Sequence, residues 1–132
     1  MKTPQQTLGR WGESQAVEYL RRKGYTILER NTRTPYGEID LVASQTLHNP
    51  QIAEAEEKVI VFVEVKTRTN SNFGYPEESV TSSKRSHLLS AAQHYIMEHP
   101  QLGDFWRIDV IAIQRTDNPR KTAILHFENA IT

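Results

Sequence analysis

One segment, residues 59–66, constrains the fold of this chain more than any other part of the sequence. It is dense in β-branched residues, and side chains on a strand alternate between two faces of a sheet. Both faces are apolar over most of its length, so the pattern predicts a central strand buried on both sides. Glu64 and Lys66 then emerge side by side from the carboxyl end of a buried strand.

The remaining sequence predicts two helices and four further strands around this segment. The helices are predicted at residues 7–23 and 81–98, because Gly24 favours a left-handed cap and Pro100 stops the second helix. The strands are predicted at residues 25–30, 38–44, 107–113 and 122–127, with loops over residues 45–58 and 70–76. The resulting order is α-β-β-β-α-β-β. We therefore predict a single α/β domain over residues 1–132, with a mixed sheet flanked by helices.

Composition excludes several kinds of site. The 132 residues contain no cysteine, which excludes disulfides, thiolate zinc sites, iron–sulfur ligation and cysteine nucleophiles. The five histidines form no i, i+3 or i, i+4 pair, so a histidine zinc site is not expected. No apolar run approaches the roughly 18–20 residues of a membrane span, and no secretory signal is visible. We therefore expect a cytoplasmic protein that does not interact with a membrane.

Charge is balanced overall and uneven along the chain. The net charge is zero, which argues against a protein that coats nucleic acid by charge alone. Residues 1–35 hold seven basic and three acidic side chains, whereas residues 36–58 hold one basic and five acidic side chains. This distribution fits a polyanion-binding flank beside a cation site, although on charge alone two ordinary solvated faces are the favoured interpretation.

Three carboxylates lie in positions where the pattern predicts burial. Glu64 ends the central strand, Asp40 lies between apolar residues on the preceding strand, and Glu13 shares an apolar stripe on the first helix. Burying unpaired carboxylates costs several kcal/mol each, unless a cation or Lys66 compensates them. Oxygen ligands without histidine or cysteine suit Mg²⁺ or Mn²⁺, and an ammonium beside such an ion is suited to phosphodiester hydrolysis. A solvated Glu13 and a surface ion pair between Glu64 and Lys66 remain the simpler alternatives.

Two further features have structural explanations. Asp109 lies between apolar residues of a strand, and we expect a salt bridge from it to Arg107 or another base. Gly9 and Gly12 are spaced three apart on the first helix, and we expect this spacing to serve packing against the sheet.

Longer motifs carry a family resemblance. Asp40 followed by Glu64-Val65-Lys66 resembles the PD-(D/E)xK signature of the restriction-endonuclease-like superfamily. The wider set comprises residues 9–13, 37–41, 62–68, 73–74, Val80 with Lys84, and residues 107–111. Together these motifs resemble the YraN-type family of bacterial predicted endonucleases over residues 8–113. That family is similar to the archaeal Holliday-junction resolvases.

The resemblance implies a restriction-endonuclease-like fold and a metal-dependent endodeoxyribonuclease, with branched or junction DNA as a candidate substrate. It implies Glu13, Asp40 and Glu64 as catalytic metal ligands for Mg²⁺ or Mn²⁺, and Lys66 as the catalytic lysine. It also implies a homodimer, in which two sites cut two strands. The expected nucleic-acid contacts are basic residues: Arg10, Arg33, Arg68, Lys84 and Arg85. The alternatives are a nucleic-acid-binding module that retains the fold without cutting, and a small structural or adaptor protein.

Overall fold

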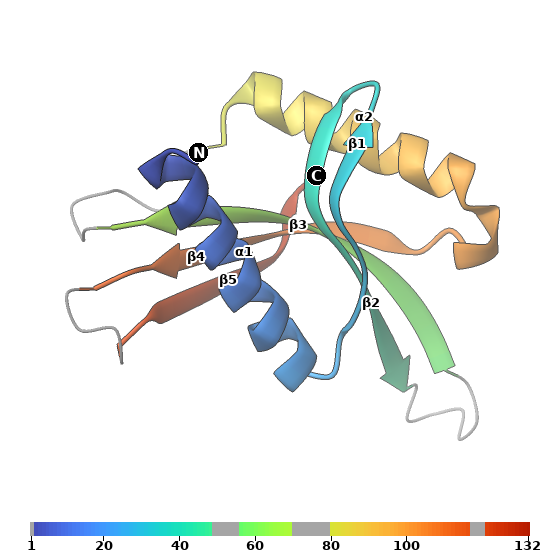
Figure 1. The fold of residues 1–132 in the computed structure, drawn as a ribbon. Helices are drawn as coiled ribbons and strands as arrows, with labels where there is room; N and C mark the ends of the chain where they lie inside the picture. Colours follow the sequence, from blue (N-terminus) through green and yellow to red (C-terminus); the bar gives the residue numbers. More distant parts are fainter. Residues whose placement is uncertain (1, 49–55, 70–79, 117–120) are drawn as a thin grey trace.

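The structure is a computed structural model that describes residues 2–48, 56–69, 80–116 and 121–132 (Figure 1). In chain order its elements are α1 (Pro4–Arg22), β1 (Thr26–Thr34), β2 (Gly37–His48), β3 (Glu56–Arg68), α2 (Ser82–Glu98), the short 3₁₀ helix η2 (Pro100–Leu102), β4 (Trp106–Gln114) and β5 (Ala123–Ile131). This is the predicted α-β-β-β-α-β-β order with η2 added.

The five strands form one mixed sheet in the order β1-β2-β3-β4-β5. Strands β3 and β4 are parallel, and α2 lies in the crossover between them. The other neighbouring strands are antiparallel. The prediction of an α/β protein with a mixed sheet is confirmed. Because β3 is the middle strand, its carboxyl end lies at the centre of one edge of the sheet.

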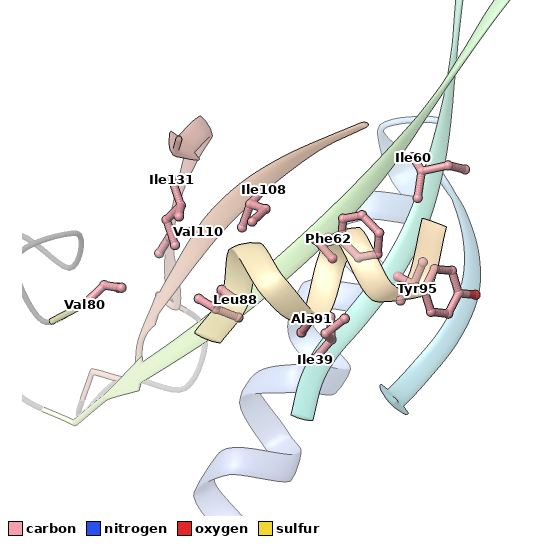
Figure 2. Packing of buried hydrophobic residues seen from close by; sticks show 12 residues of the cluster. Ile39, Ile60, Phe62, Val80, Leu88, Ala91, Tyr95, Ile108, Val110 and Ile131 are labelled. Carbon is pink, nitrogen blue, oxygen red and sulfur yellow. The ribbon is translucent and has the colours of Figure 1, made fainter. Parts of the chain in front are cut away.

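Each helix covers its own face of the sheet, and alternation along β3 divides the core accordingly. Ile60 and Phe62 belong to the cluster that contains the buried residues of α2, whereas Val61 and Val63 belong to the cluster of α1. Figure 2 shows the first cluster, in which the Phe62 and Tyr95 rings meet edge to face with centroids 5.6 Å apart. The prediction that β3 is buried on both faces is confirmed.

Helix boundaries follow from their capping residues. Thr3 and Gln6 form a reciprocal capping box, and Pro4 occupies the first turn, so α1 begins three residues before the predicted Thr7. The Thr81 hydroxyl accepts a hydrogen bond from the Lys84 N–H at 3.2 Å and caps α2. None of the helices in the described ranges is long and apolar enough to cross a membrane.

The loop predicted over residues 45–58 is wrong at both of its ends. Strand β2 continues to His48 and β3 begins at Glu56, with Gln45 opposite Val59 and His48 opposite Glu56. The polar side chains that suggested a loop are mostly exposed, and backbone pairing holds these strand ends together. Residues 49–55 and the loop predicted at residues 70–76 lie outside the described residues.

Candidate functional site

The site begins where the ladder between β2 and β3 ends. Leu41 and Val63 are the last cross-strand partners of this pair, while β2 remains paired with β1 as far as Gly37. Beyond Val63, the N–H of Val65 donates a hydrogen bond of 2.8 Å to Oδ2 of Asp40. A side-chain carboxylate thus replaces a backbone carbonyl as acceptor, and this bond holds Asp40 against β3.

Glu64 is the most buried acid of the site, with 5% of its surface exposed. Its Oε1 atom lies 3.3 Å from Nζ of Lys66 and 3.6 Å from Nζ of Lys84. Its Oε2 atom is buried and has no hydrogen-bond partner in the described part of the chain. Buried polar atoms are nearly always paired, so this oxygen indicates a position for an additional donor or cation.

The surroundings of Asp40, next to Glu64, disfavour the charged form of its carboxyl group. Burial and the nearby charge of Glu64 raise the pKa of Asp40 to about 7, although the Val65 N–H and Lys84 act in the opposite direction. Glu13 adds further negative charge near Asp40. At neutral pH the pair therefore favours a bound proton or a bound cation.

Glu13 approaches the two acids from α1. Burial raises the pKa of Glu13, while a hydrogen bond from the Asn31 side chain lowers it. Asn31 has a φ of 53°, a left-handed conformation that is uncommon for a residue other than glycine. Asparagine tolerates this conformation better than most residues, and here its side chain contacts Glu13.

The position of Glu13 depends on a close contact between α1 and β3. A Cβ atom at Gly12 would lie 2.0 Å from Oγ1 of Thr67, so only glycine fits there. This confirms the packing role predicted for Gly12. Gly9 shows no such contact, because among the described residues no atom lies within 4 Å of the position that its Cβ would occupy.

A cleft of about 360 Å³ brings the four predicted catalytic residues together. Its lining consists of Gln5, Leu8, Gly9, Glu13, Asp40, Glu64, Val65, Lys66, Thr67 and Arg68. Within the described ranges, however, no three acidic or histidine side chains converge closely enough to form a metal-binding group as they stand. The cleft thus collects the acids without completing a three-ligand site.

The predicted nucleic-acid contacts occupy different parts of this surface. Arg68 lines this cleft, whereas Arg10 and Arg33 line a second groove that shares Glu13 with it. Arg85 is half-buried in the first turn of α2. Lys84 contacts Glu64, a role that the sequence analysis missed. The available signal was a cation in the first turn of α2, where the helix dipole disfavours positive charge.

Asp109 is buried in a separate polar network. It is fully buried, and it accepts hydrogen bonds from Arg107 Nε at 3.0 Å and from the Asn129 N–H at 2.9 Å. His126 Nε2 lies 2.7 Å from its other oxygen. Burial raises the pKa of Asp109, but the hydrogen bonds from His126, Arg107 and Asn129 outweigh it and lower the pKa. The predicted salt bridge to Arg107 is confirmed.

The fold and cleft define an α/β domain with two acids and two lysines at the carboxyl end of its central strand. Residues 12–113 match the model of the uncharacterised protein family UPF0102. The chain belongs to this family, which is the YraN-type family that its motifs resemble.

Curated relatives support this membership over nearly the whole chain. A UPF0102 protein of Syntrophotalea carbinolica is 42% identical over 124 residues, which cover 94% of this chain and 90% of the relative. A UPF0102 protein of Syntrophomonas wolfei is 45% identical over 123 residues, covering 93% and 96%. A third, from Pelotomaculum thermopropionicum, is 39% identical over 130 residues, covering 98% and 99%.

Proposed function

We propose that this UPF0102 protein is a cytoplasmic, metal-dependent nuclease of restriction-endonuclease-like fold, which hydrolyses phosphodiester bonds in DNA. Branched DNA is a candidate substrate, and a homodimer would provide two sites. The observation that carries the proposal is the unpartnered, buried Oε2 of Glu64, next to a second, half-buried acid at Asp40. Both acids line an open cleft together with Lys66.

The donors in the cleft fit Mg²⁺ or Mn²⁺. Hard divalent cations prefer carboxylate and carbonyl oxygens, and the acids in this cleft supply only oxygen atoms. Asp40 and Glu64 would hold the ion, with Glu13 as a third ligand from α1. When bound, such an ion supplies Lewis-acid polarisation of the phosphoryl oxygen and lowers the pKa of water.

The chain's own groups would orient the acids and balance charge. The Val65 N–H binds Oδ2 of Asp40, so Oδ1 is the oxygen that would be offered to an ion. Lys66 lies 3.3 Å from Glu64 with 20% of its side chain exposed, so its ammonium can reach a phosphate in the cleft. There it would orient water and offset negative charge that develops on the phosphoryl oxygens.

A non-catalytic nucleic-acid-binding module is the second candidate function. The observation that favours it is the double contact of Glu64 with Lys66 and Lys84, which neutralises the acid without any ion. In this alternative the acids and lysines serve only to stabilise the fold.

Cleavage of linear, flapped and four-way DNA in Mg²⁺, in Mn²⁺ and in EDTA tests the proposal. We expect cutting that requires the metal in the wild type and is lost in Asp40→Asn, a variant of nearly the same shape. Binding of DNA without cutting in either metal would establish the non-catalytic module. Absence of both binding and cutting would favour the adaptor. Light scattering of the purified protein tests the homodimer.

A further inference from the structure

A second groove adjoins the acidic cleft. It has a volume of about 590 Å³ and is lined by Lys2, Gln6, Gly9, Arg10, Glu13, Asn31, Arg33 and Glu38. Gly9 and Glu13 line both hollows, so the groove and the cleft adjoin at these two residues of α1. We call the second hollow the basic groove, because three cations and two acids contribute to its lining.

The cations of the basic groove are available to a ligand. Lys2, Arg10 and Arg33 are exposed, and none of them forms an ion pair within 4.0 Å among the residues that the structure describes. Arg22, by contrast, is paired with Glu18 on the same helix. Exposed and unpaired guanidinium groups are the usual contacts to phosphate oxygens.

Gly9 lies at the junction of the two hollows. A glycine inside a helix makes the helix less stable than an alanine would. Glycine is suited to positions where a ligand or another segment must approach the helix backbone closely. Within the described ranges no atom lies within 4 Å of where a Cβ of Gly9 would be, so packing among these residues does not require this glycine. The opposite holds at Gly12, where Thr67 fills the space. The open surface at Gly9 is therefore suited to close contact with a ligand.

We propose that the DNA strand bound in the acidic cleft continues across α1 at Gly9 and places its next phosphates in the basic groove. This inference rests on the proposed function, since it assumes that the cleft receives a phosphodiester. It adds a direction to the substrate path, from the carboxyl end of β3 across α1 toward β1. Glu13 and Glu38 repel phosphates, so the contacts are those of Lys2, Arg10 and Arg33.

Substitution of Gly9 separates binding from folding. Gly9→Ala should raise the melting temperature, because alanine favours the helix, and should weaken affinity for fluorescein-labelled single-stranded DNA about 5-fold. Gly9→Leu should weaken that affinity more than 10-fold. A Gly9→Ala protein that melts below the wild type would show that α1 itself requires this glycine, and this result would overturn the inference.

Removal of charge tests the contacts themselves. Arg10→Gln/Arg33→Gln should reduce the slope of log affinity against log salt by about 1.4, or about 0.7 for each lost contact with a single strand. The control is Arg21→Gln/Lys23→Gln, which removes two charges at the other end of α1 and should leave the slope unchanged. Binding is measured in EDTA, and cleavage is measured separately in Mg²⁺.

The two levels of the proposal fail in different ways. A wild-type protein that neither binds nor cuts DNA would overturn the proposed function together with this inference. The strand path alone would be overturned by a different set of results. The wild type would cut DNA, Gly9→Leu would bind DNA with wild-type affinity, and Arg10→Gln/Arg33→Gln would show the same salt slope as Arg21→Gln/Lys23→Gln.

Discussion

The carboxylate of Asp40 accepts the backbone N–H of Val65 at 2.8 Å, at the point where the two strands stop pairing. One oxygen of the acid is therefore held by the backbone of the neighbouring strand. Since Val65 separates Glu64 from Lys66, the same short stretch of β3 orients Asp40 and presents both of its own charged groups. Substitutions at the site should therefore alter charge more than they alter the backbone.

The raised pKa of Asp40 predicts an unusual dependence of stability on pH. The folded protein holds a proton on Asp40 up to about pH 7, whereas the unfolded chain releases it near the ordinary value of 3.8. The folded state thus binds more protons in this window, and its free energy of unfolding falls as pH rises from about 4 to about 7. We expect the contribution of Asp40 to the free energy of unfolding to fall by on the order of 4 kcal/mol across this window. Above about pH 7 this contribution should no longer change with pH. Denaturant unfolding of the wild type against Asp40→Asn measures it.

Asp40→Asn should remove this dependence and make the protein more stable than the wild type at pH 8. The asparagine oxygen can still accept the Val65 N–H, so the backbone contact survives. Mg²⁺ should raise the melting temperature of the wild type more than that of the variant, because the ion relieves the repulsion between Asp40 and Glu64. Parallel stability curves for the two proteins would contradict the assignment.

Lys66 and Lys84 share one oxygen of Glu64, so each should partly compensate for loss of the other. We expect Lys66→Ala or Lys84→Ala alone to cost about 1 kcal/mol, and the double variant to cost about 3–5 kcal/mol, as for an uncompensated buried charge. Lys66→Ala should abolish cleavage while metal affinity is retained or increased, because a competing cation is gone. Calorimetric titration with Mn²⁺ measures that affinity.

A structural role for Lys66 gives a different result. If Lys66 is the main counter-ion of Glu64 and Lys84 cannot replace it, Lys66→Ala costs about 3–5 kcal/mol and Mg²⁺ does not restore the stability. Melting temperatures with and without Mg²⁺ distinguish this outcome from loss of chemistry in a folded protein.

Gly12→Ala should lower the free energy of unfolding by about 3 kcal/mol, because its methyl group would overlap Oγ1 of Thr67. Thr67→Ala removes that oxygen, so Gly12→Ala/Thr67→Ala should recover most of the loss. Chemical denaturation of the four proteins of this cycle gives the coupling directly. Additive effects would place the cost of Gly12→Ala elsewhere in α1.

Asn31 should respond differently to alanine and to glycine. Asn31→Ala keeps a Cβ atom in a left-handed backbone and loses the polar side chain that lets asparagine tolerate it, so it should cost about 1–2 kcal/mol, whereas Asn31→Gly keeps that conformation without strain. Asn31→Gly should nevertheless weaken Mn²⁺ binding, because Glu13 loses its hydrogen-bond partner. The matched control is Asn129→Gly at φ 50°, which lies in the Asp109 network and should leave Mn²⁺ affinity unchanged. Equal Mn²⁺ affinities in all of these proteins would exclude Asn31 from the site.

The sequence predicted those parts of the site that depend on periodicity along one element. Alternation along β3 was enough to place Glu64 and Lys66 at the end of a buried strand. Lys84 could not be found in this way, because its contact with Glu64 depends on where α2 crosses the sheet. The left-handed conformation of Asn31 could not be predicted either. Asparagine tolerates that conformation, so the hydrophobic pattern of the surrounding sequence gives no sign of it. The outer halves of the β2–β3 hairpin were read as a loop because backbone pairs hold exposed polar residues there.

The hairpin that carries Asp40 and Glu64 is made of consecutive strands, whereas Lys84 arrives with the crossover helix and Glu13 with α1. During folding the hairpin can therefore bring the two acids together while water still solvates them. They lose this water only when α1 and α2 pack against the sheet. We expect the reverse order on opening, in which α1 detaches first because its departure hydrates the acids and relieves their repulsion. Amide hydrogen exchange tests this expectation. Exchange should be faster in α1 than in β3, and exchange in α1 should be slower in Asp40→Asn than in the wild type. The crowded charges of the cleft would thus set the weakest point of the fold.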